Sequence, residues 1–375
     1  MNMRTAIVIV VVLGLIGLGL SIWTARKSQT GEPFGPAQGQ PIKIGAILML
    51  SGTGSNWGTN SQRGAELAVA EVNARGGVNG RPLQVTYEDN QGDSATAAVN
   101  GLQKLLAENI KIILGTNWTP SGLAVAPIAC DRGVLMISPS LGVRSFNERC
   151  DSLFNVWPHD DVLSERLGQW LADKGYKKIA ILGSKQEWEQ TQSEAVKRGF
   201  TEKGGTIVAY ELGQKDQKDF RTEVTKIKAS NPDAVVFTNY SYEQISAKQL
   251  REQGAKMPFY SILMDDERIK GAHGAFEGTV VITSFTPTAA FKEKFSAKYN
   301  EQPDIGADTS YDAVMLIAEA MRKTGSTDPS VLKGYLGSLK NYSGASGALT
   351  FDGKRGVTKS AQFQLVKDGK LVSYQ

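Results

Sequence analysis

Apolar and polar positions follow two alternating spacings along most of this 375-residue chain. Unbroken apolar runs, such as IKIGAILML at 42–50 and IKIILG at 110–115, are typical of strands that are buried on both faces of a sheet. The segments between such runs carry apolar residues three and four positions apart, as at Ala98 and Leu102 behind Ser94, a residue type that caps helices. Repeated strand–helix units of this kind predict parallel sheets that are covered by helices on both faces.

The expected strands fall into two groups, followed by a final β region. They cover 42–50, 81–89, 110–115 and 133–138 in the first group, 177–183, 206–212, 233–239, 258–263 and 279–284 in the second, and 346–351 and 361–374 at the end. These units are too many for one comfortable sheet, and the pattern breaks near Pro158. We therefore predict an α/β fold of two doubly wound lobes. Two consecutive helices, expected near 288–299 and 306–323, need not belong to the lobe that precedes them.

The first residues bear on the location of the protein. Residues 5–23, TAIVIVVVLGLIGLGLSIW, are uncharged, and as a helix they would be about 28 Å long, close to the hydrocarbon thickness of a bilayer. Residues 1–25 are therefore expected to be either a cleaved signal peptide or an uncleaved membrane anchor, and both would export the rest of the chain. Residues 26–40 are rich in Gly, Pro and Gln, which predicts a flexible linker.

Composition and charge argue against several classes of function. Charged residues make up 21% of the chain and the net charge is +4, so the sequence lacks the electrostatic footprint of a nucleic-acid-binding protein. The two histidines and two cysteines are far from any metal-ligand spacing, so we expect no metal site and no cofactor. In an exported chain, Cys130 and Cys150 are expected to form one disulfide, with two unpaired thiols as the alternative.

The loop SGTGSNWG at 51–58 follows the first strand and is similar to a dinucleotide-binding fingerprint. Glu88 and Asp89 come too late after its glycines for that fingerprint, and Trp57 crowds the place of a pyrophosphate. The chain contains no GxSxG or Walker motif, and neither histidine has a local nucleophile signature. We therefore predict a binding protein rather than an enzyme. The loop either faces the ligand or is a plain glycine loop.

The stretch LGTNWTPSGLAVAP at 114–127 carries a more specific signal. A strand ends at Gly115 and a helix is expected to begin near Thr119, where unpaired N–H groups and a positive dipole end attract anions. The Thr119 hydroxyl therefore either caps the helix or donates to a ligand carboxylate. Ser140 follows the next strand, and both strand ends lie on the carboxyl edge where doubly wound sheets bind ligands.

The chain resembles one known family, the extracytoplasmic solute-binding proteins of the branched-chain (leucine/isoleucine/valine) amino-acid class, which serve ATP-driven (ABC) importers. The resemblance is carried by IKIGAILMLSGTGSNWG, RGAELAVAEVNARGGVNGRPLQVTYEDNQGD, IILGTNWTPSGLAVAP, GVLMISPS and KDFRTEVTKIKASNPDAVVF. It implies a type I periplasmic-binding-protein fold, with two doubly wound Rossmann-like lobes joined by a three-crossover hinge. Lobe I would comprise 41–159 and 286–355, and lobe II 160–285 and 356–375, with one small ligand in the cleft between them.

The resemblance also implies roles for individual residues. Thr119 and Ser140 correspond to groups that bind a ligand carboxylate, whereas Gly142 stands where the family often has a further hydroxyl. Asp265 or Asp266 is the nearest candidate to receive a ligand ammonium, with a helix N-cap as the alternative role. Aromatic side chains from both lobes would cover the ligand and suit flat or apolar groups. The candidate ligand-binding residues are Trp57, Asn117, Trp118, Thr119, Ser140, Leu141, Gly142, Trp188, Tyr240, Asp265 and Asp266.

The expected function is transport without catalysis. The protein would bind a small amino-acid-like or carboxylate ligand in the periplasm or another extracytoplasmic space, and would deliver it as a monomer to an ABC permease in the membrane. Residues 5–23 could anchor it to the inner membrane. The alternative is a ligand-sensing module of the same fold, tethered to the membrane, which would bind an amide or amino acid.

Overall fold

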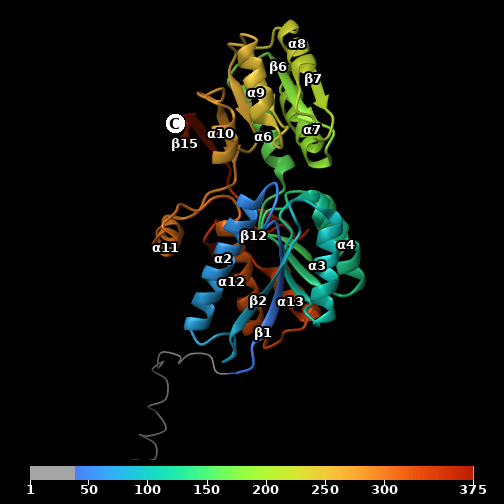
Figure 1. Ribbon diagram of the computed structural model, residues 1–375, viewed down its shortest axis with the longest axis vertical. Coiled ribbons are helices and arrows are strands. Elements are labelled where there is room, and N and C mark those ends of the chain that lie inside the picture. Colours follow the sequence, from blue (N-terminus) through green and yellow to red (C-terminus); the bar gives the residue numbers. More distant parts are fainter. Residues whose placement is uncertain (1–38, 375) are drawn as a thin grey trace, which may run out of the picture.

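The computed structural model describes residues 39–374, and these form two α/β lobes stacked along the long axis of the molecule (Figure 1). The expected signal peptide or anchor at 1–25 and nearly all of the expected linker at 26–40 lie outside the described residues. Within residues 39–374, every helix is too short or too polar to cross a bilayer.

The first lobe is built on a five-stranded sheet whose strands all pair in parallel. Its order across the sheet is β2 (Leu83–Asp89), β1 (Ile42–Leu48), β3 (Ile112–Gly115), β4 (Leu135–Ser138) and β5 (Leu153–Asn155). Successive residues of β1 enter different cores, since Ile44 and Leu48 lie in one hydrophobic cluster and Ile47 lies in another. The unbroken apolar run at 42–50 therefore belongs to a strand covered on both faces, as its sequence predicts.

Two groups of helices cover this sheet. Side chains of α2 (Ser55–Ala74), α12 (Ala307–Thr324) and α13 (Pro329–Ser338) fill one cluster, together with Phe291 and Phe295 of α11 (Ala289–Tyr299). Side chains of α3 (Ala95–Ala107), α4 (Thr119–Asp131) and α5 (Arg144–Asn147) fill the other. The consecutive helices expected near 288–299 and 306–323 thus belong to the first lobe, although the second lobe precedes them in the chain.

The second lobe is built on a seven-stranded sheet. Its order is β15 (Lys370–Ser373), β14 (Gln362–Lys367), β10 (Val280–Thr283), β9 (Phe259–Ser261), β8 (Ala234–Phe237), β6 (Lys178–Ser184) and β7 (Thr206–Gly213). Only β14 runs antiparallel to the other strands of this sheet. One face packs on α6 (Asp160–Asp173) and α7 (Glu187–Glu202), and the other on α8 (Arg221–Ala229), α9 (Glu243–Glu252) and α10 (Asp266–Gly271). The predicted α/β fold with two doubly wound lobes is therefore confirmed.

A small antiparallel sheet completes the first lobe. It consists of β11 (Tyr342–Gly344), β12 (Gly347–Phe351) and β13 (Val357–Thr358). Phe351 and Val357 are paired in this sheet, and both side chains lie in the same core as α2 and α12. The chain then returns to the second lobe through β14, so we propose that lobe II resumes after Thr358 rather than at the expected residue 356.

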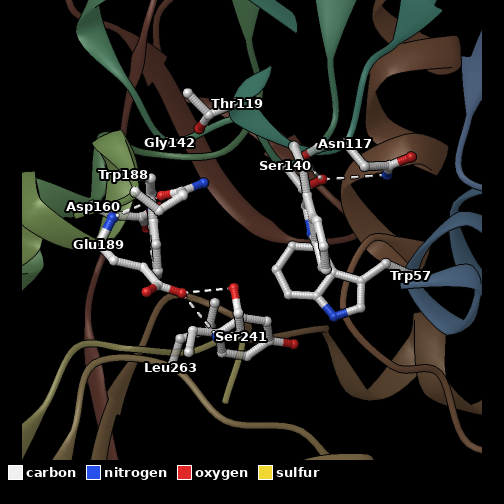
Figure 2. A pocket seen from close by; sticks show the side chains of 13 residues that line it. Trp57, Asn117, Thr119, Ser140, Gly142, Asp160, Trp188, Glu189, Ser241 and Leu263 are labelled. Atoms are coloured by element: carbon white, nitrogen blue, oxygen red, sulfur yellow. Dashed lines mark hydrogen bonds between the residues drawn. The ribbon is translucent and has the colours of Figure 1, made fainter. Parts of the chain in front are cut away.

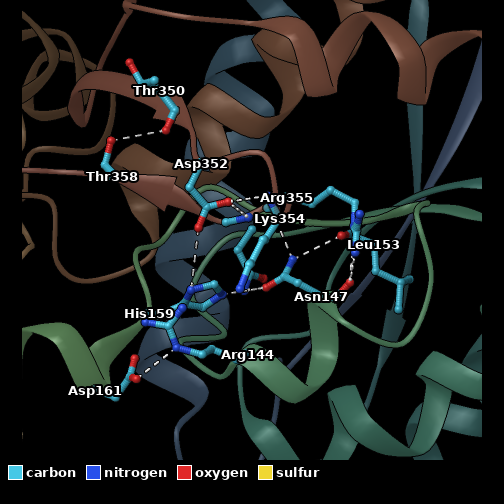
Figure 3. Close-up of polar contacts among 12 residues, drawn as sticks. Arg144, Asn147, Leu153, His159, Asp161, Thr350, Asp352, Lys354, Arg355 and Thr358 are labelled. Atoms are coloured by element: carbon cyan, nitrogen blue, oxygen red, sulfur yellow. Dashed lines mark hydrogen bonds and ion pairs between the residues drawn. The ribbon is translucent and has the colours of Figure 1, made fainter.

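The described part of the chain passes between the lobes after β5, after β10 and after β13. Polar contacts join residues near the first crossing to the β12–β13 turn, which comes just before the third (Figure 3). Asn147 Oδ1 accepts from Asn155 Nδ2 at 2.7 Å and from His159 Nε2 at 2.9 Å, so the ring proton of a neutral His159 lies on Nε2. Arg355 Nη2 donates to the Asn147 carbonyl at 2.8 Å. Burial, and to a lesser extent the charge of Arg144, lowers the pKa of His159. This histidine therefore has a structural role at the hinge.

One disulfide joins Cys130, near the end of α4, to Cys150, just before β5. The two Cα atoms lie 6.0 Å apart, and both side chains pack against the α3–α4 core of the first lobe. The bond therefore closes a loop of 20 residues around β4.

Candidate ligand-binding site

A pocket lies between the lobes, at the carboxyl ends of the strands of both sheets (Figure 2). The empty space between the lining atoms, including space that opens to solvent, is about 430 Å³. The lining residues come from strand-end loops and from the first turns of helices. They are Trp57, Asn117, Trp118, Thr119, Ser140, Gly142, Asp160, Gln186, Trp188, Glu189, Tyr240, Ser241 and Leu263.

Trp57 reaches the pocket because α2 begins very close to the end of β1. A Cβ atom at the next residue, Gly58, would lie 1.8 Å from the carbonyl oxygen of Met49, so only glycine permits this approach. Trp57 is 4% exposed, and its indole N–H donates to Asp265 Oδ2 across the cleft at 3.3 Å. The loop SGTGSNWG therefore supplies an aromatic wall for the pocket, and its ring contacts both lobes.

The loops after β3 and β4 are joined to each other by hydrogen bonds. Asn117 is fully buried; its side chain donates to Ser61 Oγ at 2.8 Å and to Ser140 Oγ at 3.3 Å, and accepts from the backbone N–H of Met49 at 3.3 Å. Ser140 Oγ in turn donates to the Asn117 carbonyl at 3.1 Å. These contacts hold the two strand ends at fixed positions, so the polar atoms of this wall are preorganised.

Thr119 is the first residue of α4 and is 5% exposed. The N-cap position is taken by Trp118, whose side chain makes no capping hydrogen bond, and the N–H of Ser121 is accepted by Asp93 Oδ1 at 3.2 Å. Burial raises the pKa of Asp93 to about 6. The Thr119 side chain lines the pocket at the positive end of the helix, where a ligand group that accepts hydrogen bonds would be stabilised.

Four aromatic rings form the apolar part of the pocket wall. Tyr240 contacts the other three, with ring centroids 5.6 Å from Trp57, 6.3 Å from Trp118 and 6.2 Å from Trp188. The two pairs that Tyr240 makes with Trp118 and Trp188 are edge-to-face, an arrangement favoured by the ring quadrupoles. Trp57 and Trp118 come from the first lobe and Trp188 and Tyr240 from the second, so these rings bring the two lobes into contact.

Asp265 and Asp266, the expected ammonium-binding acids, do not line the pocket. The Asp265 carboxylate caps α10 by accepting from the N–H of Arg268 at 2.9 Å, and it also accepts from the Tyr240 hydroxyl. It faces the buried Arg268 guanidinium at 3.5 Å. Asp266 is exposed. Asp265 thus has the alternative role, that of a helix N-cap. Its carboxylate also accepts hydrogen bonds from Trp57 and Tyr240 and holds these two rings in place.

Asp160, which the sequence did not single out, is a carboxyl group inside the pocket. It is the first residue of α6 and is 6% exposed. Its Oδ1 accepts from the Trp157 indole N–H at 2.7 Å and its Oδ2 from the Trp188 indole N–H at 2.9 Å. Burial raises the pKa of Asp160 to about 7, although the two indole hydrogen bonds oppose this shift.

Gly142 has no side chain because the Asp160 carboxyl takes that space. A Cβ atom at residue 142 would lie 1.8 Å from Asp160 Oδ2, and the Gly142 carbonyl accepts from the Asp160 N–H at 3.0 Å. At Gly142, where the family often has a hydroxyl, the space of a side chain is therefore taken by the Asp160 carboxyl group from the hinge. Leu141, between Ser140 and Gly142, points into the core of the first lobe and does not line the pocket.

Glu189 is the second carboxyl group of the pocket and is 2% exposed. One of its oxygens accepts from the N–H and the hydroxyl of Ser241 at 2.8 and 2.7 Å, and the other accepts from Ser184 Oγ. Burial raises the pKa of Glu189, and these hydrogen bonds oppose the shift. Its backbone N–H donates to the Gln186 side chain at 3.0 Å, which caps α7 and brings Gln186 to the pocket.

Five lining residues were missed by sequence reasoning, namely Asp160, Gln186, Glu189, Ser241 and Leu263. A signal for some of them was present, because Glu189 adjoins Trp188 and Ser241 adjoins Tyr240, two residues that were singled out. Asp160 follows the expected lobe boundary at residue 159. The rule to apply would have been to select the ionisable residues of the loops at the carboxyl edges of both sheets.

Comparisons with known proteins agree with this architecture. The sequence profile of the periplasmic binding protein family matches residues 41–370. Leu/Ile/Val-binding protein homolog 2 of Brucella abortus (strain 2308) is 27% identical over 351 residues, which cover 89% of this chain and 93% of the relative. The branched-chain amino acid binding protein LivJ of Streptococcus pneumoniae, solved with isoleucine, has a TM-score of 0.81 and 27% identity, over 88% of this chain and 97% of that one. A solute-binding protein of an R. palustris ABC transporter, solved with 4-hydroxybenzoate, has a TM-score of 0.81 and 22% identity, over 89% and 96% of the two chains.

A two-lobed α/β protein with a pocket between facing strand ends has the architecture of a type I periplasmic binding protein. The chain belongs to the periplasmic binding protein family, and its relatives are of the branched-chain amino-acid ABC transporter type, as the resemblance predicted. Members of this family are substrate-binding proteins rather than enzymes, and they work outside the cytoplasm.

Proposed function

We propose that this protein binds a small amino-acid-like or carboxylate solute in the pocket between its lobes and delivers it to the permease of an ABC importer. The observation that carries the proposal is that neutral hydrogen-bonding groups of the first lobe and aromatic rings of both lobes converge on one pocket. Thr119 would hold the carboxylate at the start of α4, and Ser140, whose hydroxyl donates to the Asn117 carbonyl, would keep the adjoining loop in place. The isoleucine bound by the related LivJ protein supports an amino-acid-like ligand.

Binding would work by closure of the lobes about the three crossings. An open form admits the solute to the first-lobe wall, and rotation of the second lobe then brings Trp188 and Tyr240 over it. The ligand shifts the equilibrium toward the closed form only as far as it binds that form better. The permease would then recognise the joined surface of the two lobes, which only the closed form presents.

Replacement of one hydroxyl tests the proposed carboxylate contact. A thermal-shift screen of amino acids and related carboxylates first identifies a ligand, since a bound ligand raises the melting temperature. Thr119→Val then keeps the side-chain shape and removes the donor, and should weaken binding by about 1–3 kcal/mol in calorimetry. Thr119→Ser is the matched control, because it retains the hydroxyl. Equal affinity of the valine variant and the parent protein would overturn the assignment of Thr119.

A membrane-tethered sensor of the same fold is the second candidate function. It is favoured by the uncharged run at 5–23, which is long enough to cross a bilayer if it is not cleaved. Neighbouring genes distinguish the two candidates: genes for a permease and an ATPase support transport, and a kinase or regulator gene supports sensing.

A further inference from the structure

A second pocket adjoins the ligand pocket in the cleft between the lobes. Loops at the carboxyl ends of both sheets line it, with Asp93 and Trp118 from the first lobe and Lys215 and Asn239 from the second. The empty space between its lining atoms, including space that opens to solvent, is about 850 Å³, against about 430 Å³ for the ligand pocket. We call this space the distal pocket.

The two pockets share part of one wall. The residues that line both are Trp118, Gln186, Glu189 and Ser241. Figure 2 shows two of them, Glu189 and Ser241, joined by hydrogen bonds. A solute that is held at Thr119 and is long enough can therefore extend past the shared residues into the distal pocket without leaving the cleft.

One buried hydrogen-bond acceptor of the distal pocket has no partner. Asn239 follows β8 and is 1% exposed. Its side-chain N–H donates to Ser246 Oγ at 3.0 Å, whereas its Oδ1 receives no hydrogen bond from any described residue. A buried acceptor without a donor costs about 1–3 kcal/mol. The distal pocket therefore favours a ligand group that donates a hydrogen bond.

The charges of the distal pocket favour a donor that is positively charged. Three acids line it, and Lys215 is the single cation among its lining residues. Lys215 is in an exposed loop, where solvent screens its charge, whereas Asp93 is partly buried and accepts from the N–H of Ser121 at 3.2 Å. A carboxylate at the far end of a solute would be repelled by Asp93, and an alkyl end would leave the Asn239 oxygen unpaired.

We propose that the distal pocket receives the far end of an elongated solute, and that this end carries positively charged N–H donors, as an ammonium or guanidinium group does. The inference rests on the proposed function, because Thr119 still holds the solute carboxylate in the ligand pocket. It names the class of solute as a carboxylate or amino acid whose chain is longer than that of isoleucine and ends in a basic group. Asn239 and Asp93 would then determine specificity for that end.

Two sets of six-carbon solutes test the far end. One set is hexanoate, 6-aminohexanoate and adipate; the other is L-norleucine, L-lysine and L-2-aminoadipate. Within each set the far end is a methyl, an ammonium or a carboxylate group, and L-isoleucine serves as the short reference. Thermal shift and calorimetry at pH 8 should show that, in the set that binds, the ammonium member binds at least about tenfold more tightly than the methyl member, with the carboxylate member weakest.

The outcomes separate this inference from the proposed function. A methyl member that binds as tightly as the ammonium member would overturn the inference and leave the proposed function standing. Binding of isoleucine but of no member of the two sets would have the same meaning. No binding by any of these solutes would contradict both.

Variants test the two residues. Asp93→Asn removes the charge and keeps an acceptor for Ser121, and Asn239→Leu removes the unpaired oxygen with a side chain of comparable size. Each should reduce the preference for the ammonium over the methyl member about tenfold. The preference is the useful readout, because a disturbed ligand pocket would weaken both members together. Asp219→Asn, an exposed acid outside both pockets, is the matched control. An unchanged preference in both Asp93→Asn and Asn239→Leu would overturn the proposal.

Discussion

The two sides of the pocket differ in the chemistry that they present. The first-lobe side consists of neutral groups on loops that are bonded to one another, with Asn117, Thr119 and Ser140 at the ends of β3 and β4. The other side, from the hinge and the second lobe, presents the carboxyl groups of Asp160 and Glu189. From this difference we infer that the neutral side orients a ligand and that the charged side selects it. Charge complementarity contributes more to specificity than to affinity, which fits this division.

The largest expected effect concerns Asp265, an acid that lies behind the pocket wall and does not line the pocket. Asp265→Ala leaves the buried Arg268 without its internal partner and removes the acceptor of Trp57 and Tyr240. We expect a loss of about 3–5 kcal/mol in the free energy of unfolding, because the cost of an unpaired buried charge is high. Urea denaturation followed by circular dichroism measures it. Asp266→Ala is the control at an exposed site and should change stability by less than about 0.5 kcal/mol. Similar losses in the two variants would refute the structural role of Asp265.

A smaller effect is expected when a side chain is added at Gly142, next to Asp160. Gly142→Ala places a Cβ atom 1.8 Å from Asp160 Oδ2, so the carboxyl must move from its bonds with Trp157 and Trp188. Overpacking of this kind costs about 1–3 kcal/mol of stability. Gly334→Ala, in the open space beside α13, is the control and should be neutral or stabilising by up to about 1 kcal/mol. Thermal unfolding without ligand compares them, and equal melting temperatures would contradict the predicted contact.

A further prediction is a pH dependence of stability that comes from Asp160 on the charged side. Burial raises the pKa of Asp160 to about 7, well above its ordinary value of 3.8. Protonated Asp160 therefore favours the folded state in acid, and this contribution is lost as the pH rises toward and through 7. The ligand-free parent protein should lose stability relative to Asp160→Asn between pH 5 and pH 8, at a rate of at most about 1.4 kcal/mol per pH unit. Denaturation curves at both pH values measure the difference. Parallel stability profiles of the two proteins would show that Asp160 does not titrate in this range.

An amine ligand should reverse part of that loss. A bound ammonium stabilises the ionised form of Asp160, so the affinity of the parent protein should fall below about pH 7 by up to about tenfold per pH unit. The Asp160→Asn variant should bind with a flatter profile, and calorimetry across pH 5 to 8 compares them. Changes to the neutral side, such as Thr119→Val, should leave the shape of the profile unchanged.

Much of the fold could be predicted because it depends on local periodicity. The apolar runs at 42–50 and 177–183 overlap β1 and β6, and the consecutive helices after residue 288 appear as α11 and α12. Helix α7 begins at Glu187, because the Gln186 side chain acts as its cap. We proposed a later end for the first lobe because Val357 pairs with Phe351, a contact between segments that periodicity alone does not align.

For the site, sequence alone pointed to residues at strand ends, because the carboxyl edge of a parallel sheet brings such loops together. Thr119 could be named on that basis, whereas Trp57 and Tyr240 were assigned to the ligand through the family resemblance, and all three line the pocket. Only the tertiary structure decided what each carboxyl group does. Asp265 is used within the wall, whereas Asp160 lies in the pocket. Both outcomes depend on partners from other segments, Trp57 and Tyr240 for Asp265 and Gly142 and Trp188 for Asp160. Periodicity reports which face of an element is buried, but the hydrogen-bond partners of a buried charge are set by the packing of the two lobes.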